Sequence, residues 1–181
     1  MSKQTWTELL VTDGANNGAT FSNTTTETIL FPDYTIPGGY MNDGRILRYT
    51  ALGKISATST PTFTIKLRMG GVSGTLIAQS SAITLAAATD SMFEIMIIIE
   101  SRGNGTSSPI LAMGRVMWAV TIKTTNTPDF IGSAGGASTN TPATVNVDTT
   151  QNQALSLTGT WGTANSSNSV TGMQRTIESL N

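Results

Sequence analysis

Residues 63–69 constrain the fold more than any other stretch of the chain, because apolar and polar side chains alternate along them without a break. Phe63, Ile65, Leu67 and Met69 are apolar, and the residues between them are threonine, lysine and arginine. Successive side chains of a β-strand point to opposite faces of its sheet. The segment is therefore predicted to form a strand with one face in a core and the other in water.

Two further segments alternate in the same way, at residues 46–56 and 93–101. The first is expected to place Leu47, Tyr49 and Ala51 on one side and Ile46, Arg48 and Thr50 on the other. The second is expected to place Ile95, Ile97 and Ile99 on one face and Glu94, Met96, Ile98 and Glu100 on the other. Further strands are predicted at residues 24–31, 75–85, 110–122, 154–161 and 169–180, with a bulge or bend at Gly53.

These segments predict the fold class. About eight or nine strands follow one another with no helix between them, and parallel strands need long crossover connections that are usually helical. The sheets are therefore expected to be antiparallel. An all-β, two-sheet sandwich of jelly-roll type fits the pattern best. An immunoglobulin-like sandwich and a small barrel stay open, because periodicity does not reveal strand order.

The length of 181 residues favours a single domain. We expect an N-terminal arm over residues 1–20 and one jelly-roll β-sandwich over residues 21–181, with a long loop at residues 124–144. A loop of that length is uncommon inside a compact domain, so it is expected to be either mobile or held by another chain, and the apolar Phe130 and Ile131 at its centre favour the second. The apolar side chains of the arm and the loop are the candidate partner contacts: Trp6, Leu9, Leu10, Phe130 and Ile131.

The composition argues against most catalytic chemistry, because the chain contains neither cysteine nor histidine. Thiolate nucleophiles, imidazole bases, disulfides and the commonest zinc ligands are thereby removed. Only 12% of residues are charged, with 10 basic against 11 acidic, so no basic field attracts nucleic acid or anionic lipid. We expect no enzyme, cofactor, metal, nucleic acid or membrane partner. The first residues contain no apolar stretch typical of a signal peptide.

Weaker signals point to binding or catalysis at specific residues. Tyr34 and Tyr40 are candidate sugar-binding residues, because aromatic rings stack on sugar rings. Trp118 and Trp161 lie inside strand patterns, which favours packing in the core or at a subunit interface. Residues 13–18 resemble half of a calcium loop, although a turn explains them better. A glycosidase pair of carboxylates from distant strands stays open. A basic stripe would form if the strands carrying Arg45, Arg48, Lys66 and Arg68 paired.

Several phrases together resemble jelly-roll virion proteins of tailed bacteriophages. They are Glu27-Thr-Ile-Leu-Phe, Gly44-Arg-Ile-Leu-Arg-Tyr-Thr-Ala-Leu-Gly-Lys-Ile-Ser56, Thr64-Ile-Lys-Leu-Arg-Met-Gly-Gly71, Ala112-Met-Gly-Arg115 and Leu155-Ser-Leu-Thr-Gly-Thr-Trp161. The resemblance implies a capsid decoration, or cement, protein that binds the major capsid protein as a homotrimer and stabilises the particle. It also implies synthesis in the bacterial cytoplasm and a final place on the capsid surface. Related domains occur in head fibres and tail appendages.

Three hypotheses about function therefore stand beside one another. The first is the non-enzymatic decoration protein that the resemblance implies. The second is a carbohydrate-binding protein of a head fibre or tail appendage, which would use Tyr34 and Tyr40 for host attachment. The third, a glycan-cleaving enzyme, needs a pair of carboxylates that the sequence does not place together.

Overall fold

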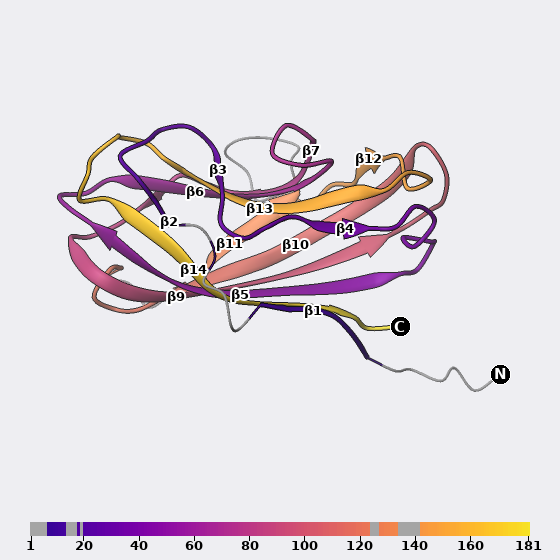
Figure 1. Ribbon diagram of the computed structural model, residues 1–181, viewed down its shortest axis with the longest axis horizontal. Coiled ribbons are helices and arrows are strands. Elements are labelled where there is room, and N and C mark those ends of the chain that lie inside the picture. The colour runs from indigo at the N-terminus through magenta and orange to yellow at the C-terminus, as the bar shows by residue number, and fades with distance from the viewer. Residues whose placement is uncertain (1–6, 14–17, 19, 124–126, 134–141) are drawn as a thin grey trace.

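The protein is described by a computed structural model, which covers residues 7–13, 18, 20–123, 127–133 and 142–181 (Figure 1). These residues form strands joined by turns and loops, and none of the described segments is a helix capable of crossing a membrane. The strands are β1 (Glu8–Asp13), β2 (Thr20–Ser22), β3 (Thr28–Ile29), β4 (Tyr34–Ile36), β5 (Ile46–Ala57), β6 (Thr62–Met69), β7 (Thr75–Ser80), β8 (Ile83–Thr84), β9 (Ala88–Ser101), β10 (Ser108–Trp118), β11 (Asp129–Ser133), β12 (Val145–Val147), β13 (Gln153–Trp161) and β14 (Ser169–Ser179).

The strands form one antiparallel sheet, which confirms the all-β and antiparallel parts of the prediction. Its main path runs β1-β14-β5-β9-β10-β11-β7-β6-β13-β3, and the four remaining short strands pair at its sides. The sheet curls, so that β1, β14, β5 and β9 form a lower layer beneath β6, β13, β3 and β4 (Figure 1). Strand β11 pairs with both β10 and β7, so the hydrogen-bonded ladder continues from one half of the sheet to the other.

Apolar and polar residues alternate strictly along the long strands, so that one row of side chains from each strand points into the core between the two layers. Along β5 and β6 every second residue is buried, as the sequence predicts. Trp161 and Phe63 pack with ring centroids 4.7 Å apart, and Phe93 and Trp118 pack 5.7 Å apart. The prediction that both tryptophans serve packing is confirmed for the core, since Trp118 is 8% and Trp161 1% exposed.

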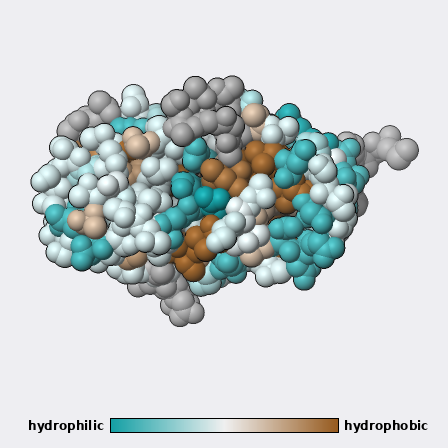
Figure 2. All heavy atoms as spheres, turned by 90° about the horizontal axis from the view of Figure 1, so that it is seen from above, coloured by the Kyte–Doolittle hydropathy of each residue, from teal (hydrophilic) through white to brown (hydrophobic). Residues whose placement is uncertain are grey.

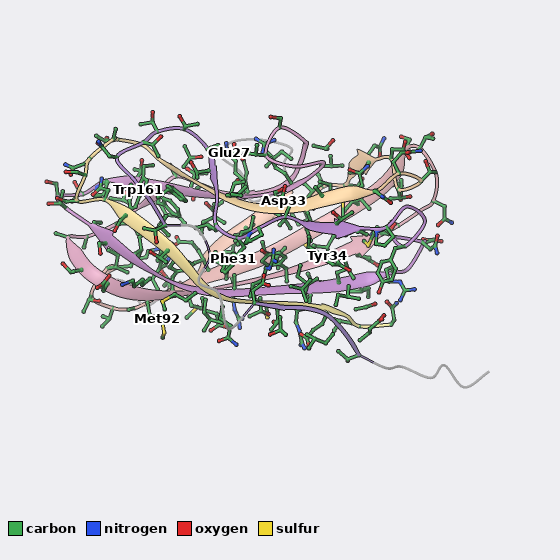
Figure 3. All side chains as sticks on the ribbon, viewed as in Figure 1. Glu27, Phe31, Asp33, Tyr34, Met92 and Trp161 are labelled. Carbon is green, nitrogen blue, oxygen red and sulfur yellow. The ribbon has the colours of Figure 1, made fainter. Side chains whose placement is uncertain are left out.

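The predicted strand at residues 24–31 is mostly a connection instead. Only Thr28 and Ile29 pair with β13. Leu30 and Phe31 then turn into the core, where both side chains are fully buried, and Phe31 lies between the two layers (Figure 3). Burial of these two side chains outweighs the strand propensity of the threonines before them.

The expected loop at residues 124–144 contains a strand. Within it β11 pairs with β10 and β7, and Ile131 supplies a core side chain there. Sequence periodicity does not reveal β11, because the strand is short and glycine follows Ile131. Residues 124–126 and 134–141 of the expected loop lie outside the described residues.

The irregularity expected at Gly53 lies on the neighbouring strand. Gly53 is paired opposite Gly172, and the register shifts between Gly172 and Gln174 of β14. A Cβ atom on Gly172 would lie 2.6 Å from both the carbonyl oxygen of Leu30 and the ring of Phe31. The absence of a side chain at Gly172 therefore leaves space for the buried connection at Leu30 and Phe31, and the bulge follows directly after Gly172.

Candidate interaction surface

The outward side of the lower layer carries many apolar side chains, and we call it the outer face. Register places side chains of neighbouring strands on it side by side: Ile98 of β9 is opposite Met113 of β10, and Met96 is opposite Arg115. Arg115 is in turn opposite Phe130 of β11. The apolar residues of the outer face and its two unpaired charged residues are Leu9, Leu52, Met92, Glu94, Met96, Ile98, Met113, Arg115, Met117, Phe130 and Met173; Arg48, Thr50, Lys54, Gln174, Thr176 and Glu178 are its other polar residues.

Most of the exposed large apolar side chains of the described residues belong to this surface. Seven such side chains are at least 38% exposed, and the outer face holds Leu9 at 57%, Met92 at 62%, Met113 at 40%, Phe130 at 59% and Met173 at 38%. Met92 projects away from the body of the protein below the lower layer (Figure 3). Leu9 is separated from the others by the Glu178–Arg48 pair, whereas the rest gather over β9, β10 and β11 and the adjoining parts of β5 and β14. Such a gathering marks an interaction site more often than scattered apolar residues do.

The methionines of the described residues lie either on the outer face or in the core. Of the eight methionines in the chain, Met41 and Met69 are buried at 2% and 1% exposure, and Met1 lies outside the described residues. The other five are the methionines of the outer face. Methionine has a flexible thioether that adapts to irregular partners, so its concentration on one exposed sheet face favours binding.

The charged side chains around the outer face are mostly neutralised within the chain. Arg48 pairs with Glu178 at 2.7 Å, and Lys54 pairs with Asp90 at 3.1 Å. Glu94 and Arg115 are different, because both are exposed and neither has an ion-pair partner among the described residues. The face therefore presents one free negative and one free positive charge among methionines.

The outer side of the upper layer carries a partly buried ion cluster. The Glu27 carboxylate accepts hydrogen bonds from Arg68 at 2.6 Å, Lys66 at 2.8 Å and Thr158 at 2.7 Å. Partial burial alone would raise the pKa of Glu27, but the hydrogen bonds from these partners, together with the charge of Arg68, lower it to about 2. The same cluster raises the pKa of the Arg68 guanidinium. Seen from above, this side is mostly polar or neutral, with apolar surface in a central region that hydrophilic side chains divide (Figure 2).

The residues predicted to contact a partner differ in their exposure in the structure. Leu9 and Phe130 lie exposed at opposite borders of the outer face, whereas Leu10 is half-buried against the core. Ile131 is only 1% exposed and points inward, so the expectation that it contacts a partner is corrected. Trp6 lies outside the described residues.

The candidate sugar-binding tyrosines are both half-buried against the core. The Tyr40 hydroxyl donates a hydrogen bond to Glu8 at 3.1 Å, and the Arg45 guanidinium lies 4.8 Å from the centre of the Tyr40 ring. Burial, with Tyr40 and Glu8 nearby, raises the pKa of Tyr34. Arg45 therefore occupies the ring face of Tyr40 that a sugar would need.

The other candidate sites do not assemble in the described residues. Strand β5 pairs with β14 and β9, so Arg45 and Arg48 lie in a different layer from Lys66 and Arg68, and no basic stripe forms. Asp13, at the start of the half calcium loop, pairs with Arg175, and residues 14–17 of that loop lie outside the described residues. No group of three or more acidic side chains within the described ranges is arranged to hold a metal ion.

Sequence reasoning finds partner contacts only in the arm and the loop, and it misses the methionines of the outer face. A signal is nevertheless present in the sequence, since the strand at 93–101 carries Met96 and Ile98 beside Glu94 on its polar side. Apolar side chains on both faces of a strand indicate that both faces are covered. Comparisons with protein-family models, curated proteins and solved structures found no match.

Proposed function

We propose that this chain is a structural protein of a tailed-bacteriophage particle, a decoration protein that binds the capsid as a homotrimer. The observation that carries the proposal is the outer face, where exposed methionines and Phe130 gather on one side of the sheet. Such a surface suits broad contact between the subunits of an assembly better than the enclosure of a small ligand. Its few free charges keep the cost of desolvation low when it is covered.

We further infer that the fold is a jelly roll, and strand pairing supports this inference. If β10 and β11 are treated as an insertion between β9 and β7, eight strands remain in chain order: β1, β3 with β4, β5, β6, β7, β9, β13 and β14. The first pairs with the eighth, the second with the seventh, the third with the sixth and the fourth with the fifth. This nested pairing is that of a long hairpin rolled into two layers, an arrangement found in viral coat and lectin domains.

Because unrelated functions share this architecture, the fold supports the proposal only by analogy. The outer face adds the argument that separates a shell protein from a lectin. A sugar bound at the predicted site would stack on the Tyr40 ring, and that ring is already covered by Arg45. A shell protein needs a broad contact repeated on every copy, because many weak contacts add up over a symmetric lattice.

The proposal is tested on particles of the phage that encodes the chain. Purified particles are separated into capsids and tails, and the fractions are examined by peptide mass spectrometry and by electron microscopy with antibodies against the chain. Presence on capsids in a fixed ratio to the major capsid protein is expected. Presence on tails alone would replace decoration with an appendage role, and absence from particles would refute the proposal.

A further inference from the structure

The two free charges of the outer face complement each other. Glu94 is opposite Met117 on the β9–β10 ladder, and Arg115 is opposite Met96. The two residues are thus diagonal neighbours on one side of the sheet, yet they form no ion pair with each other. Each charge stands beside a methionine that a partner would cover.

Covering this face without satisfying both charges would be costly. A charge buried without a partner destabilises an interface by several kcal/mol. A capsid protein would have to offer one positive and one negative group at matching positions. Neighbouring copies of this chain supply both groups, because every copy presents the same face: one neighbour offers a positive group to Glu94 and the other offers a negative group to Arg115.

We propose that the outer face is the contact between copies of this chain, with Glu94 of each copy paired to Arg115 of the next. The proposal deepens the function proposed above and rests on it for the number of copies, three. Methionine side chains from neighbouring copies would fill the space around each ion pair. In a closed ring every copy then satisfies one negative and one positive charge.

Charge reversal tests this contact. E94R would place two positive charges together between copies, and R115E would place two negative charges together. Each single variant is expected to weaken association by about tenfold or more, measured by sedimentation velocity over a range of concentrations. The double variant E94R/R115E restores opposite charges and is expected to recover the parent assembly.

Asp43 supplies the matched control, since it lies in an exposed turn away from the outer face. D43R changes the charge by the same amount as E94R and is expected to leave the assembly unchanged. Circular dichroism checks that every variant is folded. The proposal is overturned if the parent chain sediments as a monomer at all concentrations, if the folded single variants assemble like the parent, or if the double variant fails to recover.

A mixture of the two single variants separates the interface from the number of copies. In the mixture, the positive side chain at position 94 of E94R can form an ion pair only with the negative side chain at position 115 of R115E in a neighbouring copy. The unchanged Arg115 of the first variant likewise needs the unchanged Glu94 of the second, so the variants must alternate. A ring of two copies can contain one of each variant. A ring of three would place two copies of the same variant next to each other, with like charges facing. We therefore expect no recovery in the mixture, and full recovery would support the interface and refute the trimer of the proposed function.

Discussion

At the scale of single residues, Glu27 is the clearest case of a side chain whose state depends on the fold. Its carboxylate is 17% exposed and joins Lys66 and Arg68 of β6. Its pKa is lowered from 4.5 to about 2, so folding favours the ionised form. The resulting stabilisation is complete above pH 4.5 and is lost as the pH falls toward 2; with solvent screening it corresponds to about 2 kcal/mol.

E27Q is accordingly expected to lower the free energy of unfolding at pH 7 by about 2 kcal/mol, because two cations lose their carboxylate. Urea unfolding of parent and variant is measured between pH 7 and pH 2. The difference between them should shrink as the pH falls below 4.5, since protonation then removes the same charge from the parent. E178Q is the control: its pair with Arg48 is more exposed and should contribute at most about 1 kcal/mol. A difference for E27Q that does not vary with pH would contradict the role of the carboxylate.

At the scale of strands, the sequence predicts the long strands, whose apolar residues follow a clear pattern. It misses the short strands that form only because they pair with a neighbouring strand. The long strands β5, β6 and β13 are predicted within about two residues of their ends, because strict periodicity or an apolar run defines them. Strands β11 and β12 are missed, because each is short and exists through pairing with β10. Register likewise depends on residues far apart in the chain, so the sequence alone does not show that Phe130 lies beside Arg115.

The edge strand β1 is joined to the core by an ion pair that follows from the same register. Asp13 of β1 is opposite Arg175 of β14, and their side chains form a salt bridge. Arg175 is only 3% exposed, donates a hydrogen bond to the carbonyl oxygen of Pro32 at 2.5 Å, and lies 5.6 Å from the Phe31 ring centre. The pair thus ties the edge strand to the connection that fills the core.

D13N should destabilise the protein by about 3 kcal/mol, because it leaves a buried guanidinium without its carboxylate. Denaturant unfolding measures this loss, and hydrogen exchange of the β1 amides should become faster than in the parent. The double variant D13N/R175M removes the buried charge as well and is expected to be more stable than D13N. Equal stability of D13N and the parent, or a double variant less stable than D13N, would contradict this account of β1.

At the scale of the whole molecule, the distribution of methionine provides a test of assembly that needs no mutation. Oxidation to the sulfoxide requires access to the sulfur, so dilute peroxide reports which methionines are exposed. If copies meet through the outer face, Met92 and Met113 should oxidise more slowly in concentrated protein than in dilute protein, by severalfold when most chains are assembled. Peptide mass spectrometry measures each site separately.

Met41 and Met69 act as internal controls, because both are buried in the core and should resist oxidation at every concentration. Protection of the core methionines with equal rates for Met92 and Met113 at all concentrations would show a folded protein whose outer face stays uncovered. Since sulfoxides are polar, prior oxidation of the outer face should in turn shift the sedimenting species toward monomer.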